Sequence, residues 1–198
     1  MSEMLDLSIP SQEPDGAVGW YALYTRHQHE KNVAGALASK GFEVFLPLYS
    51  CAHRWKDRVK HLSLPLFPCY VFLRDPRERW LAIQTTPGLH TVVQFGGRPA
   101  MIPRPEIEAI RRVVESPLKA EPHPFLKSGD WVRVIAGPLE GLEGILLRKK
   151  NLWKLVLSVE ILQRSVAVEV DAIMVERVYV PKPGFAPGWL PTSAPARS

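Results

Sequence analysis

Apolar and polar residues alternate with a period of two along the C-terminal half of the chain. Every second residue is apolar in residues 155–161 and again in residues 166–170. Such alternation is typical of short strands that are buried on one face. Several such strands within about fifty residues favour a small closed barrel, since closure removes exposed sheet edges. We therefore expect an all-β unit in this part of the chain.

Residues 128–146, SGDWVRVIAGPLEGLEGIL, join an apolar run to closely spaced turn residues. Gly137, Gly141 and Gly144 stand where the backbone must turn or approach another strand. A residue without Cβ adopts positive φ at little cost and permits such an approach. The stretch predicts a strand, a turn and a second strand.

The N-terminal half mixes the strand period with the helical one. Val33 and Leu37 lie four residues apart on one side of an amphipathic helix, which Gly41 can end. A loop or extended hairpin is expected at residues 48–66. We expect strands at 20–25, 43–46, 70–73 and 89–95, and helices at 28–40, 77–85 and 105–115. This β-α-β-β-α-β-α order implies an α+β domain, with a mainly antiparallel sheet and helices packed against it.

Proline-rich segments divide the chain into domains. Residues 117–125 contain three prolines, which oppose helix and indicate a linker. The expected organisation is a disordered acidic N-terminus at 1–17, the α+β domain at 18–116, the linker at 117–125, the all-β domain at 126–179 and a disordered Pro-rich tail at 180–198.

Composition indicates a folded globular protein, with 46% hydrophobic and 23% charged residues. No stretch has the roughly 20 apolar residues of a membrane helix, and the N-terminus lacks the basic start of a secretory signal. With only two cysteines, the expected location is the cytoplasm. Residues 20–116 contain 14 basic and eight acidic residues, an excess that suits a polyanionic partner.

Four segments together resemble one family. They are WYALY at 20–24, LFPCYVF at 66–72, QFGGRP at 94–99 and the glycine-rich stretch at 128–146. Their order resembles that of NusG-type transcription elongation factors, with an amino-terminal NGN domain and a carboxy-terminal SH3-like KOW barrel. The histidine-rich start of the first helix is more similar to specialised paralogues of the RfaH type than to the general factor.

The resemblance implies that the NGN domain binds the clamp helices of RNA polymerase through an apolar patch and suppresses pausing or termination. Aromatic side chains suit such a patch because they supply large contact areas at low rotamer cost. The alternative is that the same rings form the core under the sheet. The matching positions are Tyr24, Phe67, Pro68, Tyr70 and Phe72.

Two groups of residues are candidates for binding the non-template DNA strand or nascent RNA. Cations of a basic loop can follow phosphates while an aromatic ring stacks on an unpaired base; the alternative is a solvated hairpin tip. No threonine-rich patch like that of the specialised paralogues is present in residues 79–83. The nucleic-acid candidates are Arg26, His27 and His29 in the first group, and Arg54, Trp55, Lys56, Arg58 and Lys60 in the second.

By the same resemblance, the KOW domain recruits a ribosomal protein or a termination factor. The matching positions are Gly137, Pro138, Leu139 and Gly141. Alternation with a period of two is hard to reuse in an amphipathic helix, which favours a permanent barrel over one that refolds. The general factor and an operon-specific paralogue both remain open.

No set of residues predicts an enzyme. Cys51, His53, His61 and Cys69 match no common zinc spacing, and no nucleophile elbow, phosphate-binding glycine loop or HExxH motif occurs. We expect no catalytic residue, cofactor or metal, and a monomer with no membrane partner. The alternative function is that of a ribosome-associated RNA-binding KOW protein, which rests on the barrel motif alone.

Overall fold

The computed structural model describes residues 19–55, 58–74, 79–126, 129–149 and 152–178. The acidic N-terminus expected at 1–17 and the tail expected at 180–198 therefore lie outside the described residues, as does Lys56.

The first domain, residues 19–115, is built on a five-stranded sheet in which every pairing is antiparallel. Its strand order is β2-β5-β1-β6, and β9 also pairs with β1. This confirms the predicted antiparallel sheet. The strands are β1 (Trp20–Thr25), β2 (Glu43–Phe45), β5 (Tyr70–Arg74), β6 (Leu89–Val92) and β9 (Met101–Ile102).

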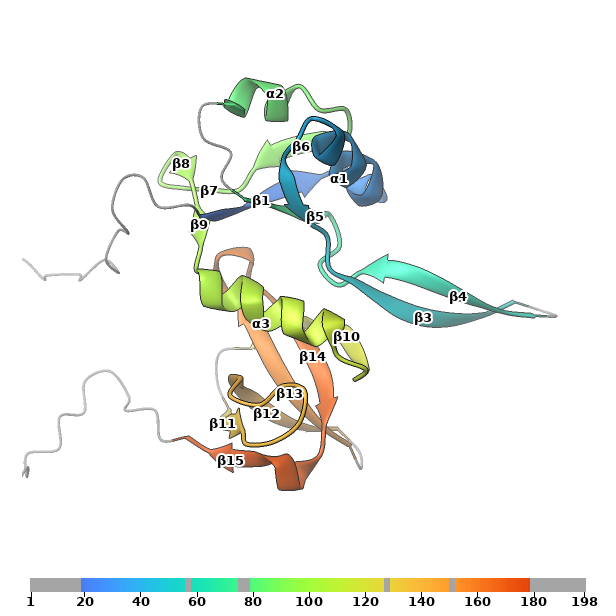
Figure 1. The fold of residues 1–198 in the computed structure, drawn as a ribbon, viewed down its shortest axis with the longest axis vertical. Coiled ribbons are helices and arrows are strands. Elements are labelled where there is room, and N and C mark those ends of the chain that lie inside the picture. Colours follow the sequence, from blue (N-terminus) through green and yellow to red (C-terminus); the bar gives the residue numbers. More distant parts are fainter. Residues whose placement is uncertain (1–18, 56–57, 75–78, 127–128, 150–151, 179–198) are drawn as a thin grey trace, which may run out of the picture.

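Helices cover both faces of this sheet. α1 (Glu30–Ser39) and α2 (Trp80–Gln84) lie on one face, and α3 (Arg104–Glu115) lies on the other (Figure 1). α1 buries Val33 and Leu37, and Gly41 follows its end with a φ of 79°. The Gly41 N–H donates to the Ala38 carbonyl at 2.9 Å, so the predicted stop at this glycine is confirmed.

Two hairpins extend from the first domain. Residues 48–66, expected as a loop or hairpin, form a hairpin of β3 (Leu48–Trp55) and β4 (Arg58–Pro65) that projects away from both domains (Figure 1). The strand expected at 89–95 is divided, because β6 ends at Val92 and β7 (Gln94–Phe95) turns back through Gly96 and Gly97 to β8 (Arg98–Pro99).

The second domain, residues 120–178, is an antiparallel sheet in the order β10-β14-β13-β12-β11-β15, which confirms the predicted β-rich C-terminal region. Gly144 allows β12 and β13 to approach closely, since a Cβ there would lie 2.6 Å from the Val156 carbonyl oxygen. The strands are β10 (Ala120–Pro124), β11 (Asp130–Val134), β12 (Glu143–Lys149), β13 (Leu152–Val159), β14 (Arg164–Val170) and β15 (Val175–Arg177).

The segment expected as a linker contains a strand. β10 pairs with β14, with Pro122 opposite Val166. Because β10 is the last strand in the order, its other edge needs no N–H donor, and an edge strand tolerates proline for that reason. Proline does exclude helix here, but residues 120–124 belong to the second sheet.

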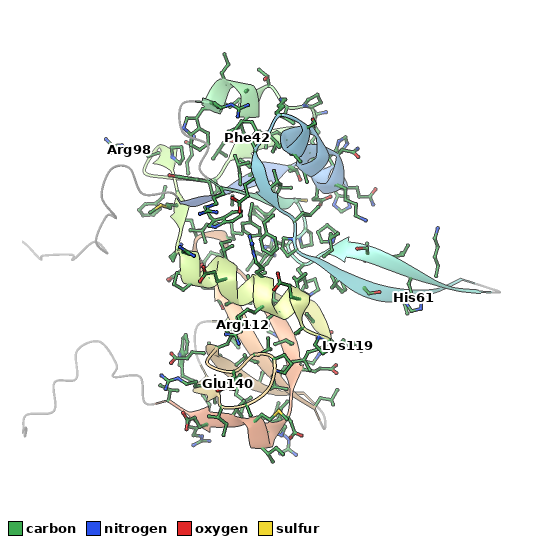
Figure 2. The ribbon with its side chains drawn as sticks, viewed as in Figure 1. Phe42, His61, Arg98, Arg112, Lys119 and Glu140 are labelled. Carbon is green, nitrogen blue, oxygen red and sulfur yellow. The ribbon has the colours of Figure 1, made fainter. Side chains whose placement is uncertain are left out.

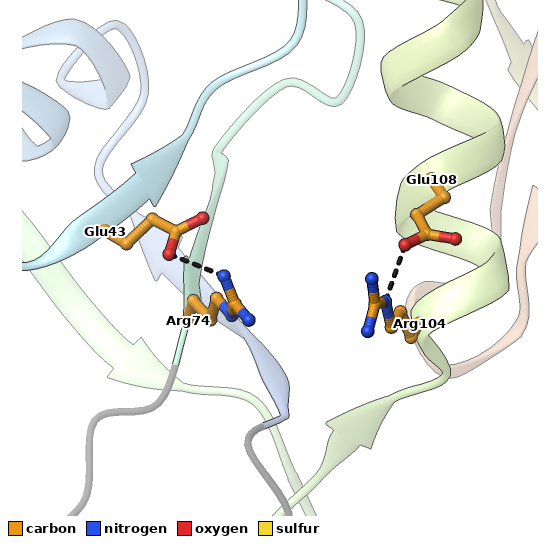
Figure 3. Close-up of polar contacts among 4 residues, drawn as sticks. All are labelled: Glu43, Arg74, Arg104 and Glu108. Carbon is orange, nitrogen blue, oxygen red and sulfur yellow. Dashed lines mark hydrogen bonds and ion pairs between the residues drawn. The ribbon is translucent and has the colours of Figure 1, made fainter.

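The buried apolar residues form two main clusters. One lies between the first sheet and the helices α1 and α2. The other, which we call the shared core, includes residues from the first sheet, from α3 and from the second domain. Surface ion pairs add little by comparison, about 0.2–1 kcal/mol each. Two of them, drawn in Figure 3, are Arg74–Glu43, with 2.9 Å between N and O, and Arg104–Glu108, with 2.6 Å.

Candidate functional site

The predicted polymerase-binding aromatics gather on one face of the first sheet. Tyr24 pairs with Tyr70, and Ala22 with Phe72, across β1 and β5. Directly opposite residues of an antiparallel pair project to the same face. Phe67 joins them from the turn before β5, with its ring edge-on to Phe72 at 5.5 Å between centroids. The sequence pattern thus places these rings together.

The five residues differ greatly in accessibility. Phe67 and Phe72 are buried, with 1% and 0% of their surface exposed, so the expectation that the rings lie outward is wrong for these two. Tyr24 is 37% exposed, Pro68 is exposed and Tyr70 is half-buried. Of these five residues, those at the Tyr24 end of the face are the ones that a partner can reach.

α3 and the second domain account for this burial. Arg111 of α3 lies over the rings of Trp20 and Phe45, at 5.5 and 5.2 Å from their centroids. The buried residues Ile107 and Ile110 of α3 belong to the same cluster as Phe72 and the apolar interior of the second domain. Phe67 and Phe72 are therefore buried by tertiary contacts. Segments distant in the chain cover a strand face whose exposure cannot be read from the sequence.

A polar contact links α3 to the predicted partner-binding turn of the second domain. Arg112 donates to the carbonyl oxygens of Pro138 at 3.1 Å and of Glu140 at 2.6 Å. Arg112 and Glu140 are labelled in Figure 2. Leu139 is buried, with 1% exposed, whereas Gly137, Pro138 and Gly141 are exposed. The backbone of this turn is therefore accessible on one side and bound to α3 on the other.

An aromatic cluster marks the open end of the sheet. The Tyr24 ring lies 5.4 Å from that of Tyr70 and 5.7 Å from that of His90. Burial raises the pKa of the Tyr70 phenol. The Arg26 N–H donates to the Gly88 carbonyl at 2.9 Å and fixes the chain that leaves β1.

The two groups of nucleic-acid candidates lie apart. Arg26, His27 and His29 are exposed between β1 and α1, beside the aromatic cluster. Arg54, Trp55, Arg58 and Lys60 are placed on the strands of the projecting hairpin, where Lys60 is exposed. The first group directly follows β1, the strand that holds Tyr24, whereas the second lies on the projecting hairpin (Figure 1).

The sequence patterns did not predict two polar features that the structure shows. His27, Glu30 and Cys69 place their ligand atoms within 4.8 Å of one another, a group assembled from separate segments with no recognisable spacing. Glu106 of α3 is a partly buried carboxylate whose pKa burial raises to about 7. An acidic residue inside an apolar helical pattern was the available signal for both Glu30 and Glu106.

Comparison with known proteins gives consistent matches. The family model described as the transcription termination factor NusG matches residues 19–111. The NusG transcription termination/antitermination protein of Thermus thermophilus is 28% identical over 179 residues, which cover 78% of this chain and 96% of that protein. The Pseudomonas aeruginosa protein of the same description is 28% identical over 176 residues, covering 80% of this chain and 98% of its own.

Among solved structures, one described as domain interaction in Thermotoga maritima NusG has a TM-score of 0.50 and 21% identity. It covers 82% of this chain and 98% of that one, which supports the fold. Within the described ranges, none of the helices combines the length and apolar character needed to cross a membrane. The matched first domain and the curated relatives aligned over nearly their full length support a NusG-type factor.

Proposed function

We propose that this NusG-type chain is a transcription elongation and antitermination factor that binds the clamp helices of RNA polymerase through its first domain. The observation that carries the proposal is the convergence of Tyr24, Phe67, Tyr70 and Phe72 on one sheet face. The names of the relatives, transcription termination/antitermination proteins, support the same process. The chain acts by binding its partners and carries out no chemical step. We place the protein in the cytoplasm.

The burial of part of this sheet face limits which residues RNA polymerase can contact. Tyr24, Pro68 and Tyr70 form the part that a partner can reach first. Phe67 and Phe72 become available only if α3 and the second domain leave the sheet, because they share one apolar core. The proposal therefore includes a closed arrangement, as in the structure, and an open one in which α3 and the second domain have left the sheet. Polymerase must bind the open arrangement more tightly than the closed one by at least the free-energy difference between them.

Substitution of the exposed rings tests the polymerase contact. Tyr24→Ala and Tyr70→Ala should each weaken binding to purified RNA polymerase by about 2 kcal/mol, or roughly 30-fold, as expected for aromatic anchors. Fluorescence anisotropy of the labelled full chain measures this loss, and the lifetime of a defined transcriptional pause should shorten less with each variant than with the unaltered chain.

Phe95→Ala is the matched control, since Phe95 is 78% exposed on β7 and outside the proposed face. Phe67→Ala is unsuitable because removing a buried phenylalanine costs about 3–5 kcal/mol of stability. Unaltered polymerase affinity in both tyrosine variants would reject the proposed surface. Co-purification with ribosomal subunits instead of polymerase would favour the ribosome-associated alternative.

The turn of the second domain completes the proposal. Gly137, Pro138 and Gly141 are exposed there, and we assign them, with Leu139, to recruitment of a ribosomal protein or a termination factor. Leu139 is buried, so it would support the shape of the turn rather than contact the partner. The operon-specific character of the chain stays a prediction.

A further inference from the structure

Three side chains of types that can bind metal ions lie close together beside the open end of the first sheet. His27 lies between β1 and α1, Glu30 is the first residue of α1, and Cys69 directly precedes β5. The Cys69 Sγ is 3.8 Å from the His27 Nδ1. Two such ligands on one tetrahedral zinc ion, with bonds of about 2.3 and 2.0 Å, are roughly 3.5 Å apart. The observed separation is close to that spacing.

Backbone contacts hold Cys69 and Glu30 in place. The Cys69 N–H donates to Glu30 Oε1 at 2.8 Å, and the Thr25 N–H donates to the Cys69 carbonyl at 2.8 Å. Glu30 is only 4% exposed, although it is charged. A carboxylate so deeply buried usually has a charged or hydrogen-bonding partner. Donors that are already ordered lower the entropic cost of binding a ligand.

The donor set selects the kind of ion. A thiolate with an imidazole and a carboxylate suits a borderline-soft cation such as Zn²⁺, whereas Mg²⁺ and Ca²⁺ prefer oxygen ligands alone. We propose that His27, Glu30 and Cys69 form a zinc site, with the fourth coordination position open to water. His27 is exposed, so an ion can reach the site from solvent. This site adjoins the polymerase contact proposed above, since Cys69 lies between Pro68 and Tyr70, but the zinc proposal does not depend on that contact.

Nearby charges act on the Cys69 thiol and on any cation bound beside it. Burial and the Glu30 carboxylate raise the pKa of the Cys69 thiol, while Arg164 of the second domain lowers it. The positive charge of Arg164 repels a bound cation. The negative charges of the Glu30 carboxylate and the Cys69 thiolate offset this repulsion.

Metal titration of the full chain tests the site. The chain, freed of metal by a chelator and kept reduced, should bind one equivalent of Zn²⁺ in competition with a chromophoric chelator. Co²⁺ should give the thiolate charge-transfer absorption that reports a Co–S bond. Cys69→Ser should abolish that band and weaken Zn²⁺ binding by more than the roughly 10- to 100-fold that loss of an outer-shell partner costs.

Two further variants and one control make the test specific. His27→Ala and Glu30→Gln should also weaken Zn²⁺ binding, and the glutamine oxygen can still accept the Cys69 N–H. Cys51→Ser removes the other free thiol and should leave both the affinity and the cobalt spectrum unchanged. Circular dichroism of the metal-free variants checks that each is folded. Absence of Zn²⁺ binding, or equal affinity in folded Cys69→Ser, would overturn the proposal.

Discussion

Glu106 links the charge of a single residue to the contact between α3 and the second domain. It lines a cavity of about 540 Å³ between them, together with Trp131 and Ser158. Burial raises its pKa to about 7; the nearby Glu160 carboxylate adds to the rise, while a hydrogen bond to the Glu160 backbone opposes it. Among the described residues, none provides a hydrogen-bond partner for Glu106 Oε2.

This raised pKa predicts a loss of stability as pH increases. The folded chain binds the Glu106 proton more tightly than the unfolded chain, whose pKa is near 4.5. The stabilisation is complete below the unfolded pKa and is lost as pH rises through the folded pKa of about 7. Glu106→Gln removes this dependence, so it should stabilise the chain at about pH 8 relative to about pH 5.

Urea unfolding of the two proteins at both pH values measures the effect. Glu108→Gln is the control, because Glu108 lies on the same helix but pairs with Arg104 on the surface. Its effect should be small, about 0.3–0.5 kcal/mol at most for a pair four residues apart on a helix. A Glu106→Gln variant with the same pH dependence as the unaltered chain would contradict the assignment.

At the residue scale, the sequence predicted which side chains share a face but not which are exposed. Alternation correctly placed Tyr70 and Phe72 on the same side of β5. It could not show that α3 covers Phe72 and leaves Tyr24 open, because burial depends on segments distant in sequence. Glu30 and Cys69 approach each other for the same reason, through the pairing of β1 with β5.

At the scale of elements, Arg112 connects α3 to the turn of the second domain. Arg112→Ala removes two hydrogen bonds to the Pro138 and Glu140 carbonyls and should lower the free energy of unfolding by about 1–2 kcal/mol. Amide hydrogen exchange should also accelerate at Gly141, whose N–H donates to the Val134 carbonyl at 2.7 Å, because the turn loses its attachment to the helix.

Arg104→Ala provides the comparison on the same helix. Arg104 pairs with Glu108, with side chains 74% and 53% exposed, and such surface pairs contribute little. Exchange at Gly141 should therefore be unchanged in this variant. Equal acceleration in both variants would indicate general fraying of α3, and no acceleration in Arg112→Ala would show that the turn is ordered without the arginine.

The β3–β4 hairpin makes a separate prediction about nucleic acid. If its cations contact phosphates, then replacing Arg54, Lys56, Arg58 and Lys60 by alanine reduces the salt dependence of single-strand binding. The slope of log affinity against log salt should fall by about 0.7 for each phosphate that the variant no longer neutralises. Lys119→Ala, a 74% exposed lysine elsewhere, should leave the slope unchanged. If the salt slope of the fourfold variant is unchanged, the hairpin cations do not contact phosphates and the hairpin is a solvated surface.

Element types were more predictable than their roles. The helices and most strands of the first domain follow the apolar periods, and the hairpin was one of two expected outcomes for residues 48–66. β10 was missed because its prolines argue against a paired strand, yet an edge position satisfies them. Sequence periodicity does not indicate which strands will be edges.

At the scale of the whole molecule, the shared core couples the two domains. It contains Phe72 of the first sheet, Ile110 of α3 and Leu155 of the second sheet, all with at most 1% exposed. Since α3 contributes to the interior on both sides, disruption of its packing affects both sheets. The other cluster, around Ile83, includes residues of the first domain alone.

Two matched substitutions distinguish coupled from independent domains. Ile110→Ala and Ile83→Ala each remove a buried isoleucine, 1% and 0% exposed, and each should cost about 2–5 kcal/mol. If the core is shared, Ile110→Ala accelerates amide exchange in both β5 and β13, whereas Ile83→Ala affects β5 and leaves β13 protected. Protection of β13 in both variants would mean that the second domain folds independently of the sheet it covers. Release of the proposed polymerase-binding face would then require less free energy than the shared core implies.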